Sequence, residues 1–97
     1  MSDNIEITLE ENDAKGRYVA VVDGHGAEMT YSRAGPATII IDHTDVPNAL
    51  RGRGVGLAMV RRAVVDARVQ GRTIFSLCPF AKAQFASHPE WRDVLKG

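Results

Sequence analysis

Cysteine is almost absent from this sequence of 97 residues, because Cys78 is the only one. An internal disulfide is therefore impossible, which fits a reducing compartment. Apolar runs are also short, and none approaches the roughly 18 residues that a membrane-spanning helix needs. Residues 1–4 show no basic region followed by an apolar stretch, so no signal peptide is visible. We therefore expect a cytoplasmic protein with no membrane partner.

An excess of either charge sign is missing as well, since twelve Lys and Arg balance twelve Asp and Glu. The charge is nevertheless uneven, because residues 51–72 hold six arginines against a single acidic residue, Asp66. Such asymmetry can mark an anionic partner. These arginines are not interleaved with aromatic residues and the chain as a whole is not basic. A nucleic-acid-binding domain is therefore the weakest of the functional interpretations, and we expect no nucleic-acid partner.

Linkers, repeats and low-complexity segments are absent too. A length of 97 residues suffices for one domain, which we assign to residues 1–97. A domain of this size buries only a modest core, so a large internal active-site cavity is not expected. The spacing of the three histidines and Cys78 matches no zinc signature, and we expect no metal site.

What the sequence does contain is a series of short strand patterns. Ile5, Ile7 and Leu9 alternate with polar residues, which is the period of a half-buried strand. Three more patterns cover residues 17–22, 27–33 and 37–44, and turn signals at 11–16, 23–26 and 34–36 separate the four. The fourth is the most β-branched, which predicts a central position in the sheet. The short connections predict an antiparallel meander.

A helical pattern follows from about Val55 to Gln70, and Gly71 is its expected C-cap. Residues 73–77 predict a fifth strand, which the helical crossover makes parallel to the fourth. We expect a second helix over residues 80–86. Its predicted inward-facing side chains are Phe80, Ala83 and Phe85.

Pro89 suits the first turn of a last short helix that holds Trp91 and Leu95. The predicted fold class is α+β, a mostly antiparallel sheet in the order β-β-β-β-α-β-α with helices packed on it.

The segment Arg51-Gly52-Arg53-Gly54-Val55-Gly56 opens the long helix. Glycines let a ligand approach the backbone, and the N–H groups of a first helical turn have no intrahelical partner. With the helix dipole they predict a phosphate site, to which Arg51 and Arg53 add donors. A P-loop would need Gly-Lys-Ser/Thr at this helix start, and that sequence is absent. The dinucleotide-binding pattern G-x-G-x-x-G fails as well, because its last glycine would fall on Leu57 or Met59. The alternative is a loop whose glycines only allow a turn.

Arg51, Gly54 and Gly56 do fit R-x-x-G-x-G. This resembles the acetyl-coenzyme A loop of the GNAT acetyltransferase superfamily, whose pattern is Q/R-x-x-G-x-G/A. Two further stretches resemble the minimal, single-domain GNAT-like proteins: residues 42–47 look like the end of the cofactor-contacting strand, and residues 78–91 look like their tail. The resemblance covers roughly residues 36 to 95. It implies a GNAT-like (acyl-CoA N-acyltransferase) fold and an N-acetyltransferase that uses acetyl-coenzyme A and an amine acceptor.

The resemblance also implies roles for particular residues. The pyrophosphate anchors would be Arg51, Gly52, Arg53, Gly54, Val55 and Gly56. The backbone of Thr44, Asp45 and Val46 would hold the pantetheine arm, on which Phe80 could pack. A backbone N–H near His43 and Thr44 is a candidate oxyanion donor.

His43 is the candidate general base, because it lies two residues beyond the apolar Ile41 and so on the same strand face. A structural histidine is the alternative. Cys78 ends the strand after the helix, where the family holds the thioester. It could accept the acetyl group as a thiolate or line the acetyl pocket during direct transfer, or it could be an ordinary buried cysteine.

The sequence departs from the larger family members, which have one or two helices between the first two strands. Here only a turn joins Leu9 to Arg17, so part of the usual acceptor groove is missing. The open site would suit a large acceptor such as a protein amine. The alternative function is a non-catalytic acyl-coenzyme A-binding module, and we expect a monomer in either case.

Overall fold

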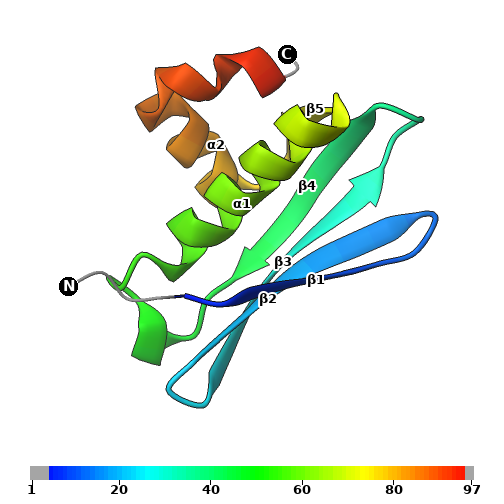
Figure 1. The fold of residues 1–97 in the computed structure, drawn as a ribbon. Helices are drawn as coiled ribbons and strands as arrows, with labels where there is room; N and C mark the ends of the chain where they lie inside the picture. The colour runs from blue at the N-terminus through cyan, green and yellow to red at the C-terminus, as the bar shows by residue number, and fades with distance from the viewer. Residues whose placement is uncertain (1–4, 96–97) are drawn as a thin grey trace.

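The computed structural model describes residues 5–95, and it contains one mixed sheet with helices on it (Figure 1). The strands are β1 (Ile7–Glu11), β2 (Lys15–Val22), β3 (His25–Arg33), β4 (Thr38–Asp45) and β5 (Thr73–Ser76), in the spatial order β1-β2-β3-β4-β5. The helices are the short 3-10 helix η1 (Asn48–Leu50), α1 (Val55–Gln70), α2 (Pro79–Ser87) and the 3-10 helix η2 (Pro89–Val94). The predicted α+β order is confirmed.

The strands β1 to β4 form the predicted antiparallel meander, and β5 runs parallel to β4 as the crossover through α1 requires. β4 lies inside the sheet, between β3 and β5, although β3 occupies the middle position. β1 begins at Ile7, two residues later than predicted, and it extends to Glu11, which pairs with Gly16 across the first hairpin. The Asn12 side chain accepts the N–H groups of Ala14 and Lys15 and so shortens that turn.

The core lies between the sheet and α1, whose predicted bounds are confirmed. The buried residues of α1 are Val55, Gly56, Met59, Val60, Ala63, Val64 and Ala67. They face buried residues of the inner strands, including Met29 and Ile41. The hydroxyl of Tyr18 donates a 2.8 Å hydrogen bond to Asp66 of α1. Burial and this carboxylate raise the pKa of Tyr18 well above its usual range.

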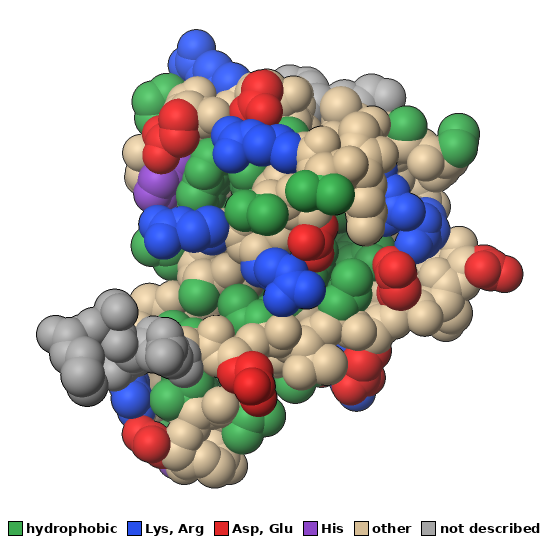
Figure 2. All heavy atoms as spheres, viewed as in Figure 1, with side chains coloured by type: hydrophobic (Ala, Val, Ile, Leu, Met, Phe, Trp, Pro, Cys, Tyr) green, Lys and Arg blue, Asp and Glu red, His purple; other side chains and the backbone are tan. Residues whose placement is uncertain are grey.

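The arginines of α1 belong largely to the fold. Arg62 pairs with Asp66 one turn later, and Arg68 pairs with Asp93 of η2 at 2.8 Å. Figure 2 shows basic side chains spread over the helical half of the molecule, with acidic ones among them. Exposed pairs of this kind contribute little to stability, but they account for basic residues that no anionic ligand needs to explain.

The inward face of α2 differs from the prediction. Ala81 and Phe85 are buried, one helical turn apart, whereas Phe80 and Ala83 are exposed. The helix begins at Pro79, and its buried side packs on Trp91, whose ring meets Phe85 edge-on at 5.8 Å. The prediction of Phe80 and Ala83 as core residues was therefore wrong, because the tertiary contact with η2 selects the buried side of so short a helix.

The three longer helical segments α1, α2 and η2 lie on one face of the sheet and contact one another (Figure 1). We call the opposite side the outer face. In residues 5–95 no helix covers it, and Val21 and Leu77 are more than half exposed there. Only a three-residue turn connects β1 to β2, as predicted.

Candidate functional site

The glycine loop ends in an uncapped helix start. Gly52 and Gly54 have φ values of +79° and +76°, in the left-handed region that favours glycine. Gly54 is the N-cap of α1, no side chain caps this end, and the first turn holds no acidic residue. The first-turn N–H groups and the positive end of the helix dipole are therefore suited to an anion.

A cavity of about 550 Å³ lies against this helix start. It is lined by the end of β4, by η1, by the glycine loop with the first turn of α1, and by one side of α2. Its lining residues are Thr44, Val46, Leu50, Arg51, Gly52, Gly54, Val55, Gly56, Leu57, Phe80 and Gln84. The structure thus gathers eight of the predicted cofactor-contacting residues around one space.

Three of the lining residues, Leu50, Leu57 and Gln84, were not predicted as site residues. Leu50 and Leu57 flank the loop, and from the sequence alone their apolar side chains indicate core positions rather than a site. Gln84 had a usable signal, because it follows Phe80 by one helical turn and so lies on the same side of α2.

Two predicted cofactor residues lie outside the cavity. The guanidinium of Arg53 turns to Asp23 in the β2–β3 turn and binds it at 2.6 Å. This hydrogen bond lowers the pKa of Asp23 below its usual value. The pair ties the glycine loop to a hairpin thirty residues earlier. Asp45 is exposed and stands opposite Glu28 of β3, on the outer face.

Phe80 forms one wall of the cavity through a close approach to α1. A Cβ placed on Gly56 would lie 2.6 Å from the Cζ atom of Phe80, so only glycine allows the ring to lie this near the helix backbone. The ring remains 38% exposed. It is thus available to pack against a ligand that enters between α1 and α2.

The strands β4 and β5 separate beside this cavity. Their pairing ends at Ile41 and Ser76, followed by a 3.0 Å hydrogen bond from the Leu77 N–H to the Ile41 carbonyl. β4 continues to Asp45, whereas β5 ends at Ser76 and the chain then enters α2. A bound extended ligand could therefore lie along the free side of β4.

Cys78 lies where the strands separate. It is the N-cap of α2, its side chain is 4% exposed, and its thiol donates to the Thr44 hydroxyl at 3.4 Å. Thr44 in turn lines the cavity. Cys78 is thus one side chain removed from the cavity, behind Thr44, rather than part of its lining.

The prediction that His43 shares a face with Ile41 was wrong. Tyr31 stands opposite Ile41, but the next residue back, Thr30, stands opposite His43, so Asp42 is an extra residue in β4. This β-bulge reverses the alternation of the strand. Asp42 and His43 therefore both project from the outer face, while Thr44 faces the helical side opposite the buried Met29.

The cavity carries no obvious proton acceptor. Within residues 5–95 no Asp, Glu, His or Cys side chain lines it. The same part of the chain contains no group of three or more metal-binding side chains and no helix that is long and apolar enough to cross a membrane. The described lining thus offers the N–H groups of a helix start and the Arg51 guanidinium to an anion, but it supplies no carboxylate, imidazole or thiol as a base.

Comparison with known proteins agrees with this geometry. The family model described as GCN5-related N-acetyl-transferase matches residues 17–94. The chain is also similar to the NMR solution structure of a GCN5-like candidate N-acetyltransferase from Staphylococcus aureus, with 33% sequence identity and a TM-score of 0.75. That match covers 97% of this chain and 90% of the other. A comparison with curated proteins gives no match. Since the family model spans most of the sequence and the solved structure nearly all of it, the chain belongs to the GCN5-related N-acetyltransferase family.

Proposed function

We propose that the protein binds acetyl-coenzyme A and transfers its acetyl group to an amine. The observation that carries the proposal is the cavity of about 550 Å³, in which an uncapped helix start, the free end of β4 and the Phe80 ring meet. The helix start suits the pyrophosphate, and the free end of β4 and the Phe80 ring suit the extended pantetheine arm. The pyrophosphate would bind the first-turn amides of α1, with Arg51 as the charged side chain at the cavity wall.

The thioester would lie where β4 and β5 separate, near Thr44 and Cys78. For transfer, an ammonium first gives a proton to a base, and the free amine then attacks the thioester carbonyl. The new C–N bond forms as the C–S bond breaks, and coenzyme A leaves as a thiolate that takes up a proton. A backbone N–H near Thr44 remains the predicted oxyanion donor.

The lack of a base in the cavity lining supports a second candidate, a module that binds acyl-coenzyme A without catalysis. The two differ in one measurable property. With acetyl-coenzyme A and a panel of peptide and polyamine acceptors, an enzyme releases free coenzyme A at a rate that depends on the acceptor. A binding module gives the same slow release with and without acceptors.

Calorimetric titration of coenzyme A into two arginine variants tests the binding site itself. Arg51 lines the cavity, whereas Arg61 is an exposed residue two turns further along α1. Arg51→Ala should weaken binding by about 1–3 kcal/mol, the value of one charge-assisted contact. Arg61→Ala removes the same charge and should leave the affinity unchanged. Equal losses in both variants would show a diffuse charge effect and contradict the assigned site.

A further inference from the structure

Residues 51–54 of the glycine loop are weakly held by their own contacts. All four are exposed, and a Cβ placed on Gly52 or Gly54 would meet no atom within 4 Å. The backbone hydrogen bonds that join the loop to η1 are local and long, at 3.2 and 3.3 Å. Because glycine leaves the backbone free to adopt many conformations, a loop of this kind keeps one arrangement only if a contact from elsewhere holds it.

Asp23 supplies such a contact. Its carboxylate accepts a hydrogen bond of 2.6 Å from the guanidinium of Arg53, which stands between the two glycines of the loop. The β2–β3 turn and the loop lie at the same end of the molecule (Figure 1). No strand ladder joins these two segments, because the loop follows η1 after β4 has ended. The ion pair therefore fixes the middle of the loop relative to the sheet.

Asp23 itself is held in a defined place. With Gly24 it forms the two-residue turn between Val22 and His25, which pair across β2 and β3. The φ values of Asp23 and Gly24 are +52° and +79°, and two positive values in an Asp-Gly turn are typical of the tight hairpin that suits the twist of its strands. Among residues 5–95, Asp23 is the only residue other than glycine with a positive φ. The turn thus gives the carboxylate a fixed position from which to hold Arg53.

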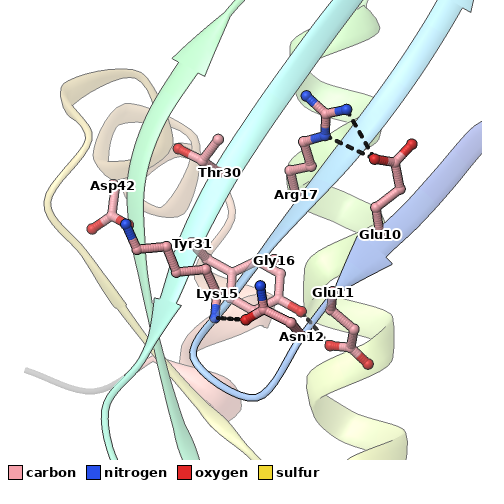
Figure 3. Close-up of a pocket in the computed structure, with 9 residues that line it drawn as sticks. All are labelled: Glu10, Glu11, Asn12, Lys15, Gly16, Arg17, Thr30, Tyr31 and Asp42. Atoms are coloured by element: carbon pink, nitrogen blue, oxygen red, sulfur yellow. Dashed lines mark hydrogen bonds and ion pairs between the residues drawn. The ribbon is translucent and has the colours of Figure 1, made fainter.

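Not every exposed ion pair of the molecule has this effect. Figure 3 shows Arg17 of β2 bound to Glu10 of β1, with 2.9 Å between the two side chains. These two residues are direct cross-strand partners, so the hydrogen bonds of the ladder already set their positions. An exposed pair adds little to such an arrangement. The pair of Asp23 and Arg53 differs because it reaches a segment that no ladder holds.

We infer that Asp23 is a positioning residue for the pyrophosphate of coenzyme A: through Arg53 it holds the glycine loop in the arrangement that presents the first-turn amides of α1. The inference rests on the proposed function. Neither Asp23 nor Arg53 lines the cavity, so both act on the ligand indirectly, through the loop. The β2–β3 hairpin thus takes part in cofactor binding without touching the cofactor.

Two opposing effects decide the sign of this contribution. A ligand that orders a mobile loop loses affinity to the conformational entropy of that loop, and glycine has the most backbone freedom to lose. A loop that is already held avoids this loss. Against it stands the repulsion between the Asp23 carboxylate and a pyrophosphate. That repulsion is small, because the carboxylate is 69% exposed, screened by water and salt, and balanced by Arg53 at 2.6 Å. The net effect of Asp23 is therefore tighter binding.

The test is a calorimetric titration of coenzyme A into the full chain and its Asp23→Gly variant. Glycine removes the carboxylate and adopts the same φ without strain, so the hairpin should keep its thermal stability. We expect coenzyme A to bind about two- to fivefold more weakly, as for one exposed ion pair. The affinity for pantetheine, which has no phosphate, should not change. Glu10→Gln is the matched control, because it removes the exposed partner of Arg17 and should leave coenzyme A binding unchanged.

Two further measurements examine the loop itself. NMR relaxation of the ligand-free chain should show greater mobility of the Gly52 and Gly54 amides in Asp23→Gly than in the wild type. In an Arg53→Ala background, Asp23→Gly should have no further effect on coenzyme A affinity, because the contact through which it acts is already gone.

Three results would overturn the inference. Tighter coenzyme A binding by Asp23→Gly would show that the carboxylate repels the pyrophosphate. An equal loss of affinity with and without Arg53 would show that Asp23 does not act through it. Unchanged affinity or unchanged loop mobility in Asp23→Gly would show that the pair holds nothing that binding needs. If the wild type does not bind coenzyme A, the proposed function fails, whereas the mobility of the ligand-free loop still decides whether Asp23 holds it.

Discussion

Replacing Gly54 with valine separates the binding role of the glycine loop from its role in the fold. Gly54 has a φ of +76°, and a Cβ placed there would meet no atom within 4 Å. The cost to the folded state is therefore backbone strain alone, about 1–3 kcal/mol. For a domain of this size each kcal/mol lowers Tm by about 4–8 °C. The valine side chain would also stand over the first-turn amides, where it would block a pyrophosphate.

Gly35→Val is the matched control. Gly35 has a φ of +90° and equally open surroundings, but it precedes β4 at the end of the strand away from the glycine loop. Both variants should lose similar thermal stability, measured by circular dichroism. Only Gly54→Val should lose affinity for coenzyme A, and we expect the loss to be tenfold or more. A tenfold loss corresponds to about 1.4 kcal/mol of binding free energy, which is the value of one charge-assisted hydrogen bond. If folded Gly54→Val binds coenzyme A as tightly as Gly35→Val does, the assignment of the loop is wrong.

Two other predictions concern side chains near the site and in the core. If the amine attacks the thioester directly, Cys78→Ser should keep its affinity for coenzyme A and most of the transfer rate. Mass spectrometry of the wild type should then find no acetylated enzyme. An acetyl adduct on Cys78 that decays at the turnover rate would contradict direct transfer. The Tyr31 hydroxyl donates a hydrogen bond to the Glu11 carboxylate, and this bond is the main reason why the pKa of Glu11 is lowered. Burial raises the pKa of Tyr31 itself to about 12. Because the folded pKa of Glu11 lies below 4.5, its stabilisation is full above that pH and is lost as the pH falls through the folded value. The stability difference between wild type and Tyr31→Phe, from urea denaturation, should be largest at neutral pH and narrow in acid, and a constant difference would contradict the assigned hydrogen bond.

Much of the fold was predictable because its signals are local. α1 begins after Gly54 and ends before Gly71, and both glycines adopt the left-handed conformation. Residues with this freedom mark helix ends in a sequence without reference to the rest of the chain. The order of the strands followed from the short turns, and the parallel β5 followed from the length of the crossover.

The errors arose where contacts between distant segments decide the outcome. The face of His43 depends on the register between β3 and β4, and the extra residue Asp42 in that pairing leaves no mark on the alternation of β4 alone. The orientation of Arg53, which lies at a variable position of the loop pattern, likewise depends on Asp23, which lies on a hairpin that only the folded sheet brings near. Spacing within one segment could not predict either contact.

The most direct test of the central claim is an NMR titration of acetyl-coenzyme A into the full chain. The account predicts saturable binding, with the largest amide shifts at Gly52, Gly54 and Gly56 of the loop and at Thr44 and Val46 of β4, since these residues line the cavity beside α1. Absence of saturable binding, or shifts confined to parts of the sheet away from this cavity, would contradict it.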